Sequence, residues 1–467
     1  MQVLAALATI RIATSLMSPS QVGSVNQITA LSALLYAMFI TPVSYYVGRG
    51  LLDWHDAGLL TRRIRGFIRY AAIVSVLGAL AVFMFKLAVD IVPSVSVQWV
   101  SLLVAIYLLA FSIHTVAGTG LVILGRQAAY AIFINAASWA GLAAAVLFFW
   151  QTARPEMWLL GVYGGFVFSS CLYAISAHFR PPHNSLAETR HEDHVPFTYK
   201  KVFAFAWPMA IVYALSWVQL QSYRFVLEDV AGLVSVGLFF AAHAVCAAPM
   251  QTFQTMFNEF YSQTLYRKLK GGSRGEQAGA WNAYAEAYIP AVILFGAFLA
   301  GCGPYLAKIL LGPEFQVVAA ILIWPALVET LRAISTSVDT MGIVKVDMRV
   351  NLVPAIIGAV CAPWLIYALA GDDPLVGTGI ALSLAGLAGL IVVIPISYRV
   401  LPIRWPAKRI ILALLAGLPM VIVGNIASRS AGAVTWADAL VALLAGAAYL
   451  LVAQYLLARK WLQKMPA

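Results

Sequence analysis

The sequence predicts an all-α polytopic membrane protein with about fourteen transmembrane helices. Of its 467 residues, 62% are hydrophobic and only 10% are charged, whereas soluble domains contain about 45–50% apolar and about 25% charged residues. The mean hydropathy is +0.86. The apolar residues fall in runs of about 20, the length that a helix needs to cross a hydrocarbon core of about 30 Å. These observations exclude a soluble enzyme, a nucleic-acid-binding protein and a disordered chain.

Six apolar runs precede the polar segment 181–199, which separates two sets of spans. We expect each run to be a helix, because lipid cannot satisfy the hydrogen bonds of an open backbone. Alternating segments of about ten residues, which would indicate a membrane barrel, are absent. The predicted spans of this set are 1–17, 25–48, 67–87, 97–120, 128–150 and 157–177.

Eight further runs follow, as a second set of six and a final pair. Polar connections in corresponding places, 49–66 after the second span and 257–283 after the eighth, indicate an internal duplication of six spans. Two lobes around a midplane site are common in transporters. The predicted spans are 200–224, 233–256, 284–309, 315–341, 350–369, 375–397, 409–427 and 438–458.

The duplication predicts four parts of the chain. An N-lobe at 1–180 and a C-lobe at 200–397 contain six helices each, and the polar segment 181–199 links them on the cytoplasmic side. The segment 398–467 contains the two additional helices and a cytoplasmic tail.

The positions of lysine and arginine predict the orientation. Of the 30 such residues, 23 lie at alternate connections, from 49–69 to the tail at 459–464, and five lie at the opposite ends of the spans. Cytoplasmic connections carry the excess of positive charge in membrane proteins. Both termini are therefore predicted to be cytoplasmic, as an even number of spans requires.

The sequence has no recognisable motif for catalysis or metal binding. It lacks a Walker A loop and the patterns His-Glu-x-x-His, Cys-x-x-Cys and Gly-x-Ser-x-Gly, and no polar connection exceeds about thirty residues. The four cysteines lie in apolar runs without metal or redox spacing. We therefore expect no enzyme activity, no cofactor and no metal site.

Ionisable residues at membrane depth are the candidate site residues, because a charge at the bilayer centre costs about 2.5–3.5 kcal/mol and normally faces a partner or a wet cavity. Arg332 follows Glu329 by three residues, so it either pairs along its helix or lines a cavity. Arg49 is either an interfacial anchor or a cavity residue. The candidates for a cationic substrate cavity are Arg11, Arg224, Arg332 and Arg49. The candidates for coupling or pairing are Glu329, Asp339 and His243.

Two short motifs resemble the signatures of a known family. Leu16-Met-Ser-Pro-Ser-Gln-Val-Gly23 is similar to a signature leucine–small–Pro–x–x–hydrophobic–Gly that follows the first span. In the second lobe, Tyr223-Arg224-Phe225 and Ser235-Val236-Gly237-Leu238-Phe239 resemble Asp-Arg and Val-Gly-hydrophobic-Tyr-Ser. Both signatures are those of the Wzx-type polysaccharide flippases. Here Tyr223 replaces the acid, and Phe239-Phe240 replaces Tyr-Ser. Arg11 precedes Gly23 by twelve positions and Arg224 precedes Gly237 by thirteen, so each lobe has an arginine in a similar place.

The resemblance covers essentially the whole chain and places it in the superfamily of multidrug, oligosaccharidyl-lipid and polysaccharide exporters. It implies a two-lobed transporter of the bacterial inner membrane. The implied activity is to flip undecaprenyl-diphosphate-linked oligosaccharide repeat units, of O-antigen, other lipopolysaccharide or exopolysaccharide, from the cytoplasmic to the periplasmic leaflet by alternating access. Implied partners are this lipid-linked substrate, membrane lipids and other polysaccharide-assembly proteins, and no nucleic acid. Arginines would suit the anionic diphosphate and acidic sugars.

Three alternatives stay open. A cation-coupled multidrug exporter of the same fold would need buried carboxylates, and the deep acids are few, namely Glu329 and Asp339. A lipid II flippase would share both the fold and a diphosphate-linked substrate. A membrane glycosyltransferase or polymerase of surface polysaccharide tends to carry a large periplasmic loop, whereas the longest predicted periplasmic connection has about nine residues.

The orientation can be tested with fusions after Met465. A fluorescent protein matures in the cytoplasm and alkaline phosphatase is active in the periplasm, so we expect the first fusion to fluoresce and the second to be inactive. The reverse result would place the C-terminus in the periplasm and contradict the fourteen-span topology.

Overall fold

The structure is a computed structural model that describes residues 1–89, 91–123, 125–178, 199–271, 273–345, 352–430 and 434–462. Every regular element in these ranges is a helix. Among the described residues, eleven helices are long and apolar enough to cross a membrane, or up to twelve if the bent pair Pro313–Ile321 and Ile323–Val338 is counted as one span. The all-α polytopic class is therefore confirmed, and the number of fourteen spans stays a prediction.

Two local features explain why the described residues contain fewer membrane-spanning helices than the fourteen predicted. Helix α1 (Gln2–Leu16) is apolar but has 15 residues, fewer than a full crossing needs. Lys200–Asn258 forms one apolar stretch of 59 residues, where two spans are predicted. Within that stretch, Gly232 interrupts helix α9 (Tyr223–Gly271) with φ 79° and ψ 169°. Glycine adopts such a conformation because it has no Cβ.

The chain divides into two compact units. Unit 1 consists of Met1–Thr9 and Ser24–Trp217, and unit 2 consists of Ile10–Gly23 and Val218–Ala467. The predicted linker 181–199 lies outside the described residues except for Tyr199. The predicted lobes follow the internal duplication of six spans, whereas the two units follow the packing of the helices. The lobe boundaries stay a prediction.

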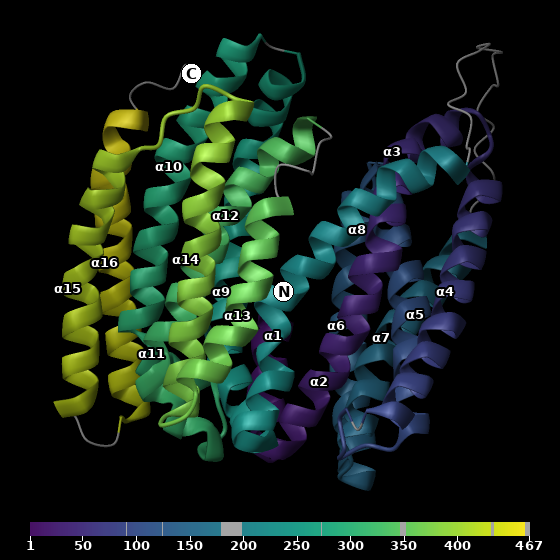
Figure 1. Cartoon of the computed structure of the whole chain (residues 1–467), viewed down its shortest axis with the longest axis horizontal. Helices are drawn as coiled ribbons and strands as arrows, with labels where there is room; N and C mark the ends of the chain where they lie inside the picture. Colours follow the sequence, from purple (N-terminus) through teal and green to yellow (C-terminus); the bar gives the residue numbers. More distant parts are fainter. Residues whose placement is uncertain are drawn as a thin grey trace. The chain divides into compact units, whose positions relative to one another are not determined.

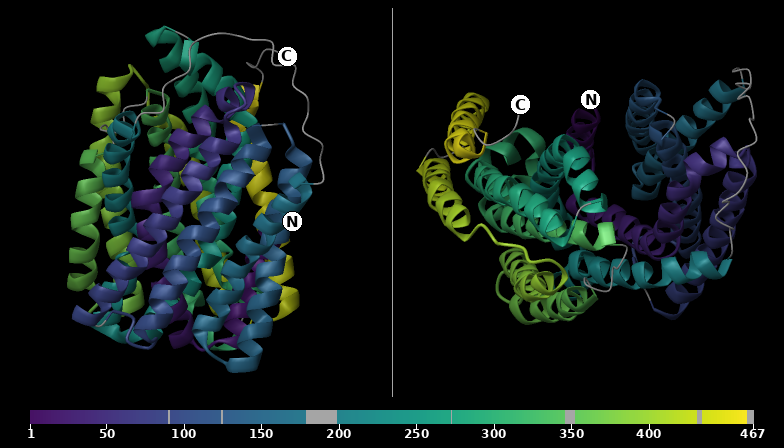
Figure 2. Two further views of the ribbon diagram at one scale, coloured as in Figure 1. Left: turned by 90° about the vertical axis from the view of Figure 1, so that its right-hand side faces the viewer. Right: turned by 90° about the horizontal axis from the view of Figure 1, so that it is seen from above.

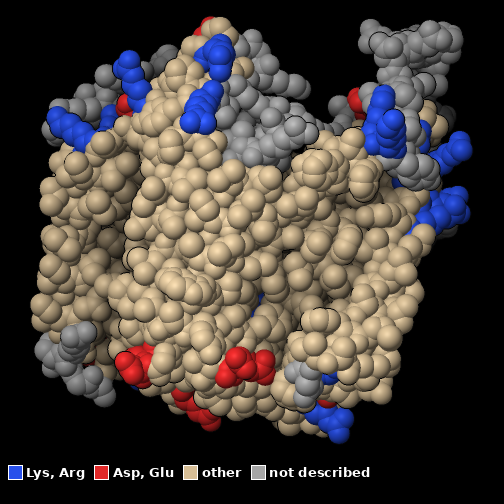
Figure 3. Space-filling view, viewed as in Figure 1, with Lys and Arg blue, Asp and Glu red and all other residues tan. Residues whose placement is uncertain are grey.

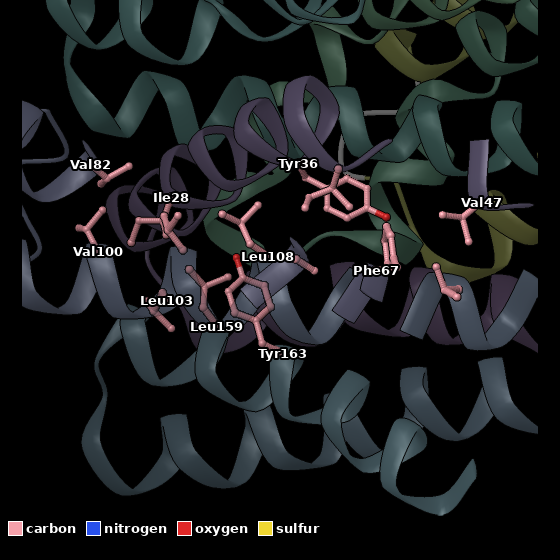
Figure 4. Close-up of a cluster of buried hydrophobic side chains, with 14 of the residues drawn as sticks. Ile28, Tyr36, Val47, Phe67, Val82, Val100, Leu103, Leu108, Leu159 and Tyr163 are labelled. Carbon is pink, nitrogen blue, oxygen red and sulfur yellow. The ribbon is translucent and has the colours of Figure 1, made fainter. Parts of the chain in front are cut away.

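Unit 1 is built around a layer of branched and aromatic side chains. Ile28, Leu108, Leu159 and Tyr163 lie in this cluster, which Figure 4 shows in close-up, and each is almost fully buried. The Tyr163 ring lies 5.1 Å from the ring of Tyr107. The elements of unit 1 are α2 (Pro19–Leu35, whose first turns belong to unit 2), the π-helix η1 (Tyr36–Ile40), α3 (Thr41–Asp56), α4 (Leu60–Ala88), α5 (Val97–Ile123), α6 (Gln127–Thr152), α7 (Pro155–His178) and α8 (Tyr199–Gln221, whose last four residues belong to unit 2).

Helix α10 (Arg274–Gly301) is the centre of unit 2. It packs against α9, α12, α15 and α16, and its Trp281 is fully buried and donates a hydrogen bond to the Ser337 carbonyl at 3.2 Å. Helices α15 and α16 lie side by side at one edge of the unit (Figures 1 and 2). The other elements are α11 (Gly303–Leu310), the 3₁₀-helix η2 (Pro313–Ile321), α12 (Ile323–Lys345), α13 (Leu352–Leu369), α14 (Pro374–Val400), α15 (Ala407–Ser430) and α16 (Trp436–Leu462).

Charged residues of opposite sign lie at opposite ends of unit 2. Helix α14 has Asp373 as its N-cap and Arg399 in its last turn. In Figure 3, the part of the face that unit 2 forms has mostly blue and a few red residues at one end, red residues at the other, and a nearly uncharged band between them. An apolar band between two charged ends is typical of a protein embedded in a bilayer. Which end faces the cytoplasm stays a prediction.

The two glycines of the family-like motifs, Gly23 and Gly237, meet within unit 2. A Cβ on Gly237 would collide with the Pro19 carbonyl and lie 3.0 Å from the Gly23 nitrogen. A Cβ on Gly23 would collide with the Leu233 carbonyl. The start of α2 and the middle of α9 therefore cross in backbone contact, which explains why both motifs contain glycine.

We expect Gly237→Ala to destabilise unit 2 by about 1–3 kcal/mol, because the added methyl group must displace a backbone. The matched control is Gly279→Ala on α10, where a Cβ would meet nothing within 4 Å. Thermal unfolding of the purified proteins measures both effects. Equal unfolding temperatures for the two variants would contradict the close crossing of α2 and α9.

Candidate functional site

A buried carboxylate lies at the centre of the candidate site in unit 2. Glu329 of α12 is 1% exposed, and its Oε2 accepts hydrogen bonds from Arg332 Nη2 at 2.6 Å and from Arg332 Nε at 2.8 Å. Nε2 of His243, on α9, lies 3.1 Å from Glu329 Oε1. One carboxylate is thus shared by a guanidinium and an imidazole, and the intrahelical pair that the spacing of Glu329 and Arg332 suggested is present.

The network continues from Arg332 through two uncharged side chains. Arg332 Nη2 donates to Gln254 Oε1 at 2.7 Å, and Gln254 Nε2 donates to the Tyr288 hydroxyl at 2.8 Å. The Tyr288 hydroxyl donates to the Ala333 carbonyl at 3.2 Å, which returns the chain of contacts to α12. The network therefore joins α9, α10 and α12, and it satisfies polar groups that would be costly to bury alone.

Helical spacing explains how these residues come together. Glu329 and Arg332 are three positions apart and share one face of α12. His243 and Gln254 are eleven positions apart, which is close to three turns, so they share one face of α9. Because α9 and α12 pack against each other, the two polar faces meet.

Aromatic rings surround Arg224, which is the second residue of α9 and is 8% exposed. Its guanidinium carbon lies 5.6 Å from the ring centroids of both Tyr223 and Phe240, a distance suited to cation–π interaction. The Tyr223 ring packs edge-on against Phe239 at 5.0 Å and lies 6.4 Å from the His243 ring. Tyr223 therefore links the guanidinium of Arg224 to the imidazole of His243.

Arg11 lies in another part of unit 2, where it joins α1 to the turn between α11 and η2. Its Nη1 donates to the carbonyl of Leu311, the C-cap residue of α11, and its guanidinium lies 5.7 Å from the Trp436 ring of α16. Nearby, the Gly312 amide donates to the Thr14 hydroxyl at 2.9 Å. A cation at the carbonyl end of a helix is stabilised by the helix dipole.

The structure thus brings together three of the predicted candidates, Glu329, Arg332 and His243, and Tyr223 lies against both His243 and Arg224. Arg49 lies on α3 and Asp339 lies on α12, but the structure does not describe the side chain of either residue. In the described ranges, no group of three or more His, Cys, Asp or Glu side chains could hold a metal ion. The role of every candidate in substrate binding stays a prediction.

Sequence reasoning missed Gln254, Tyr288 and Trp436. A glutamine inside an apolar helix could have been found by the criterion used for charges, because an unpaired amide is also costly in lipid. Tyr288 and Trp436 follow no such signal, since aromatic residues are frequent throughout the chain, which contains 20 tyrosines and 13 tryptophans.

We expect Arg332→Ala to be more destabilising than the double variant Glu329→Gln/Arg332→Ala. Removing only the arginine leaves a buried carboxylate without its guanidinium, which costs about 3–5 kcal/mol, whereas the double variant removes both charges. The matched control is Arg409→Ala, because Arg409 pairs with the half-exposed Glu286 at 3.1 Å and an exposed pair contributes only about 0–1 kcal/mol. Thermal unfolding of the three purified variants measures the order, and a double variant less stable than the single one would contradict this account.

Comparison with known proteins identifies the fold. No family model matches the sequence, and no curated protein matches it. The lipid II flippase MurJ in its inward closed conformation is similar in structure, with a TM-score of 0.65, 12% identity, and coverage of 99% of this chain and 98% of that chain. An inward-facing multidrug resistance transporter of the MATE family in the MOP superfamily has a TM-score of 0.57, 13% identity, and coverage of 86% and 94%. A MOP superfamily transporter from Pyrococcus furiosus has a TM-score of 0.57, 13% identity, and coverage of 85% and 91%. The chain therefore has the fold of MurJ and MATE transporters.

Proposed function

We propose that this protein is a flippase that moves an undecaprenyl-diphosphate-linked oligosaccharide repeat unit from the cytoplasmic to the periplasmic leaflet by alternating access. The observation that carries the proposal is the extent of the structural similarity. The likeness to a lipid II flippase covers 99% of the chain, whereas the likenesses to the multidrug transporter and to the Pyrococcus furiosus protein cover 86% and 85%. A fold shared with a lipid flippase over its full length favours a lipid-linked cargo.

The C-terminal pair α15 and α16 supports the same proposal. Both helices pack on α10, so they belong to unit 2 as an integral part of it. Their outer faces carry large exposed apolar side chains, among them Leu415, Val423 and Leu444. We propose that this face accompanies the long polyprenyl tail of the substrate while the head group crosses.

The charges of the Glu329 network favour an anionic head group over a cationic drug. The Glu329 carboxylate is already engaged by Arg332 and His243, so it is not available to bind a cation. Arg332 keeps donors for an anion, because its Nη1 makes no hydrogen bond to the described residues. A diphosphate could therefore bind Arg332 through a planar guanidinium while Glu329 retains His243.

Two cargoes are consistent with these features. The family-like motifs around Gly23 and Gly237 favour a repeat unit of O-antigen or exopolysaccharide. The structural likeness to MurJ favours lipid II, and this alternative is supported to a comparable degree. Both cargoes carry a polyprenyl diphosphate.

The remaining parts of the proposal follow from the flippase activity. The protein would lie in the bacterial inner membrane with both termini in the cytoplasm, and it would work with other membrane proteins of polysaccharide assembly. Flipping a lipid-linked cargo makes or breaks no covalent bond, so we assign no catalytic residue.

Genetic complementation tests the proposal. We expect the chain to restore surface polysaccharide in a bacterium that lacks its repeat-unit flippase. Arg332→Ala should abolish this activity, and Arg332→Lys should retain part of it, because lysine keeps the charge but loses the planar donor set. Arg409→Ala is the control, and membrane levels of each variant are measured alongside.

Complementation of a second strain distinguishes the alternatives. Rescue of a MurJ-depleted strain, without rescue of the repeat-unit flippase mutant, would assign lipid II as the cargo. Failure in both strains together with increased resistance to cationic drugs would overturn the flippase proposal in favour of an exporter.

A further inference from the structure

Unit 1 contains a cavity of about 1080 Å³ that the proposed function does not use. The cavity is lined by residues of four elements, η1, α3, α4 and α8. Four arginines of α4 lie in its wall, and the described lining contains no carboxylate. These arginines are Arg62, Arg63, Arg65 and Arg69.

Two of the four arginines, Arg62 and Arg63, lie in the first turn of α4, where a helix least favours positive charge. Helix α4 begins at Leu60, has no side-chain cap and has no acidic residue in its first turn. Its free backbone N–H groups therefore add positive potential to that of Arg62 and Arg63. Arg62, Arg65 and Arg69 form no ion pair with any residue that the structure describes. An anion bound here would balance the combined charge.

The rest of the cavity wall is apolar and includes exposed side chains of two helices. Phe203, Trp207 and Ile211 of α8 follow one another at four-residue spacing, and Phe203 is 71% exposed. On α4, the face that carries Arg69 continues with exposed Ile73 and then, on the same stripe, with Leu77, Leu80 and Met84. The arginines therefore lie at one end of an exposed apolar surface, of the kind that hydrocarbon chains cover in a bilayer.

We propose that this cavity binds an anionic phospholipid of the leaflet in which the arginines lie. The phosphate contacts Arg62, Arg65 and Arg69, and an acyl chain lies between the apolar faces of α4 and α8. Basic pockets between membrane helices bind anionic head groups in this way, and arginine forms charge-assisted hydrogen bonds to phosphate. The cavity is formed entirely by unit 1 and opens on exposed helix faces, which favours a lipid of the surrounding bilayer over a transported cargo.

Such a lipid would also strengthen the attachment of α8 to unit 1. Helix α8 contacts α3 through Phe205 and Tyr46, whose ring centroids are 5.8 Å apart, and Trp217 donates to the Ala30 carbonyl at 2.9 Å. Toward α4, the two helices face each other across the cavity. A lipid that fills the cavity adds contacts on that side, so binding should raise the unfolding temperature.

The test uses the full-length protein, purified in a neutral detergent and titrated with phosphatidylglycerol. Bound lipid is counted by native mass spectrometry, and the thermal midpoint is recorded in parallel. We expect the triple variant Arg62→Gln/Arg65→Gln/Arg69→Gln to bind at least tenfold more weakly and to lose the rise in the midpoint. The matched control, Arg399→Gln/Arg404→Gln/Lys408→Gln, removes the same charge from the basic end of unit 2 and should bind as the wild type does.

A second variant keeps the test informative if the triple variant folds poorly. Trp207→Ala leaves all the arginines in place and removes part of the apolar wall, so it should weaken the binding of phosphatidylglycerol but not that of inorganic pyrophosphate. Unchanged lipid binding in Trp207→Ala would overturn the proposal.

Four further results would also overturn it. An equal loss of phosphatidylglycerol binding in the two triple variants would mean that the lipid is attracted only by the overall positive charge. Binding of phosphatidylcholine as tight as that of phosphatidylglycerol would mean that the anionic head group plays no role. Pyrophosphate binding as tight as that of the lipid would assign the cavity to a free anion. In a competition experiment, undecaprenyl diphosphate could displace phosphatidylglycerol from the wild type but not bind to the triple variant of α4. That result would assign the cavity to the transported cargo.

Discussion

The burial of one carboxylate constrains most of unit 2. Glu329 lies deep among apolar helices, and an isolated charge there would be prohibitively costly. It is stable only because Arg332 and His243 approach it from α12 and α9. Arg332 in turn engages Gln254, which reaches α10 through Tyr288. The relative register of three helices thus depends on where one acid is placed, since a shift of one residue along any of them would break the series of contacts.

Positive charge in this protein is accommodated in three different ways. Arg332 is held by a carboxylate, Arg224 by aromatic faces, and Arg11 by a helix-terminal carbonyl together with a tryptophan ring. These environments differ in what they leave available to an incoming anion. A carboxylate competes directly with a phosphate for the same donors, whereas an aromatic ring attracts the guanidinium through its face, and the Tyr223 hydroxyl also accepts a hydrogen bond from Arg224 Nε.

Local patterns in the sequence were sufficient for the class and for part of the site. Run length and composition predicted the all-α membrane fold, and the three-residue spacing suggested the pairing of Glu329 with Arg332. The contact of Arg11 with Leu311 joins residues 300 positions apart, and no periodicity predicts which carbonyl a distant arginine meets. Gln254 was missed because only ionisable residues were considered at membrane depth, and Tyr288 because aromatic residues are frequent throughout the chain. The arginines of α4 were interpreted only as a topology signal, because their cavity exists only once α8 lies against the same unit.

The crossing of α2 and α9 at Gly23 and Gly237 has a mechanical consequence. Most helix pairs interlock, with the side chains of one seated between those of the other, and this sets a preferred angle. Here the two backbones touch at both glycines, so α2 and α9 can approach no closer at this point. The first turns of α2, which belong to unit 2, are therefore held at a fixed distance from α9 by the chain itself.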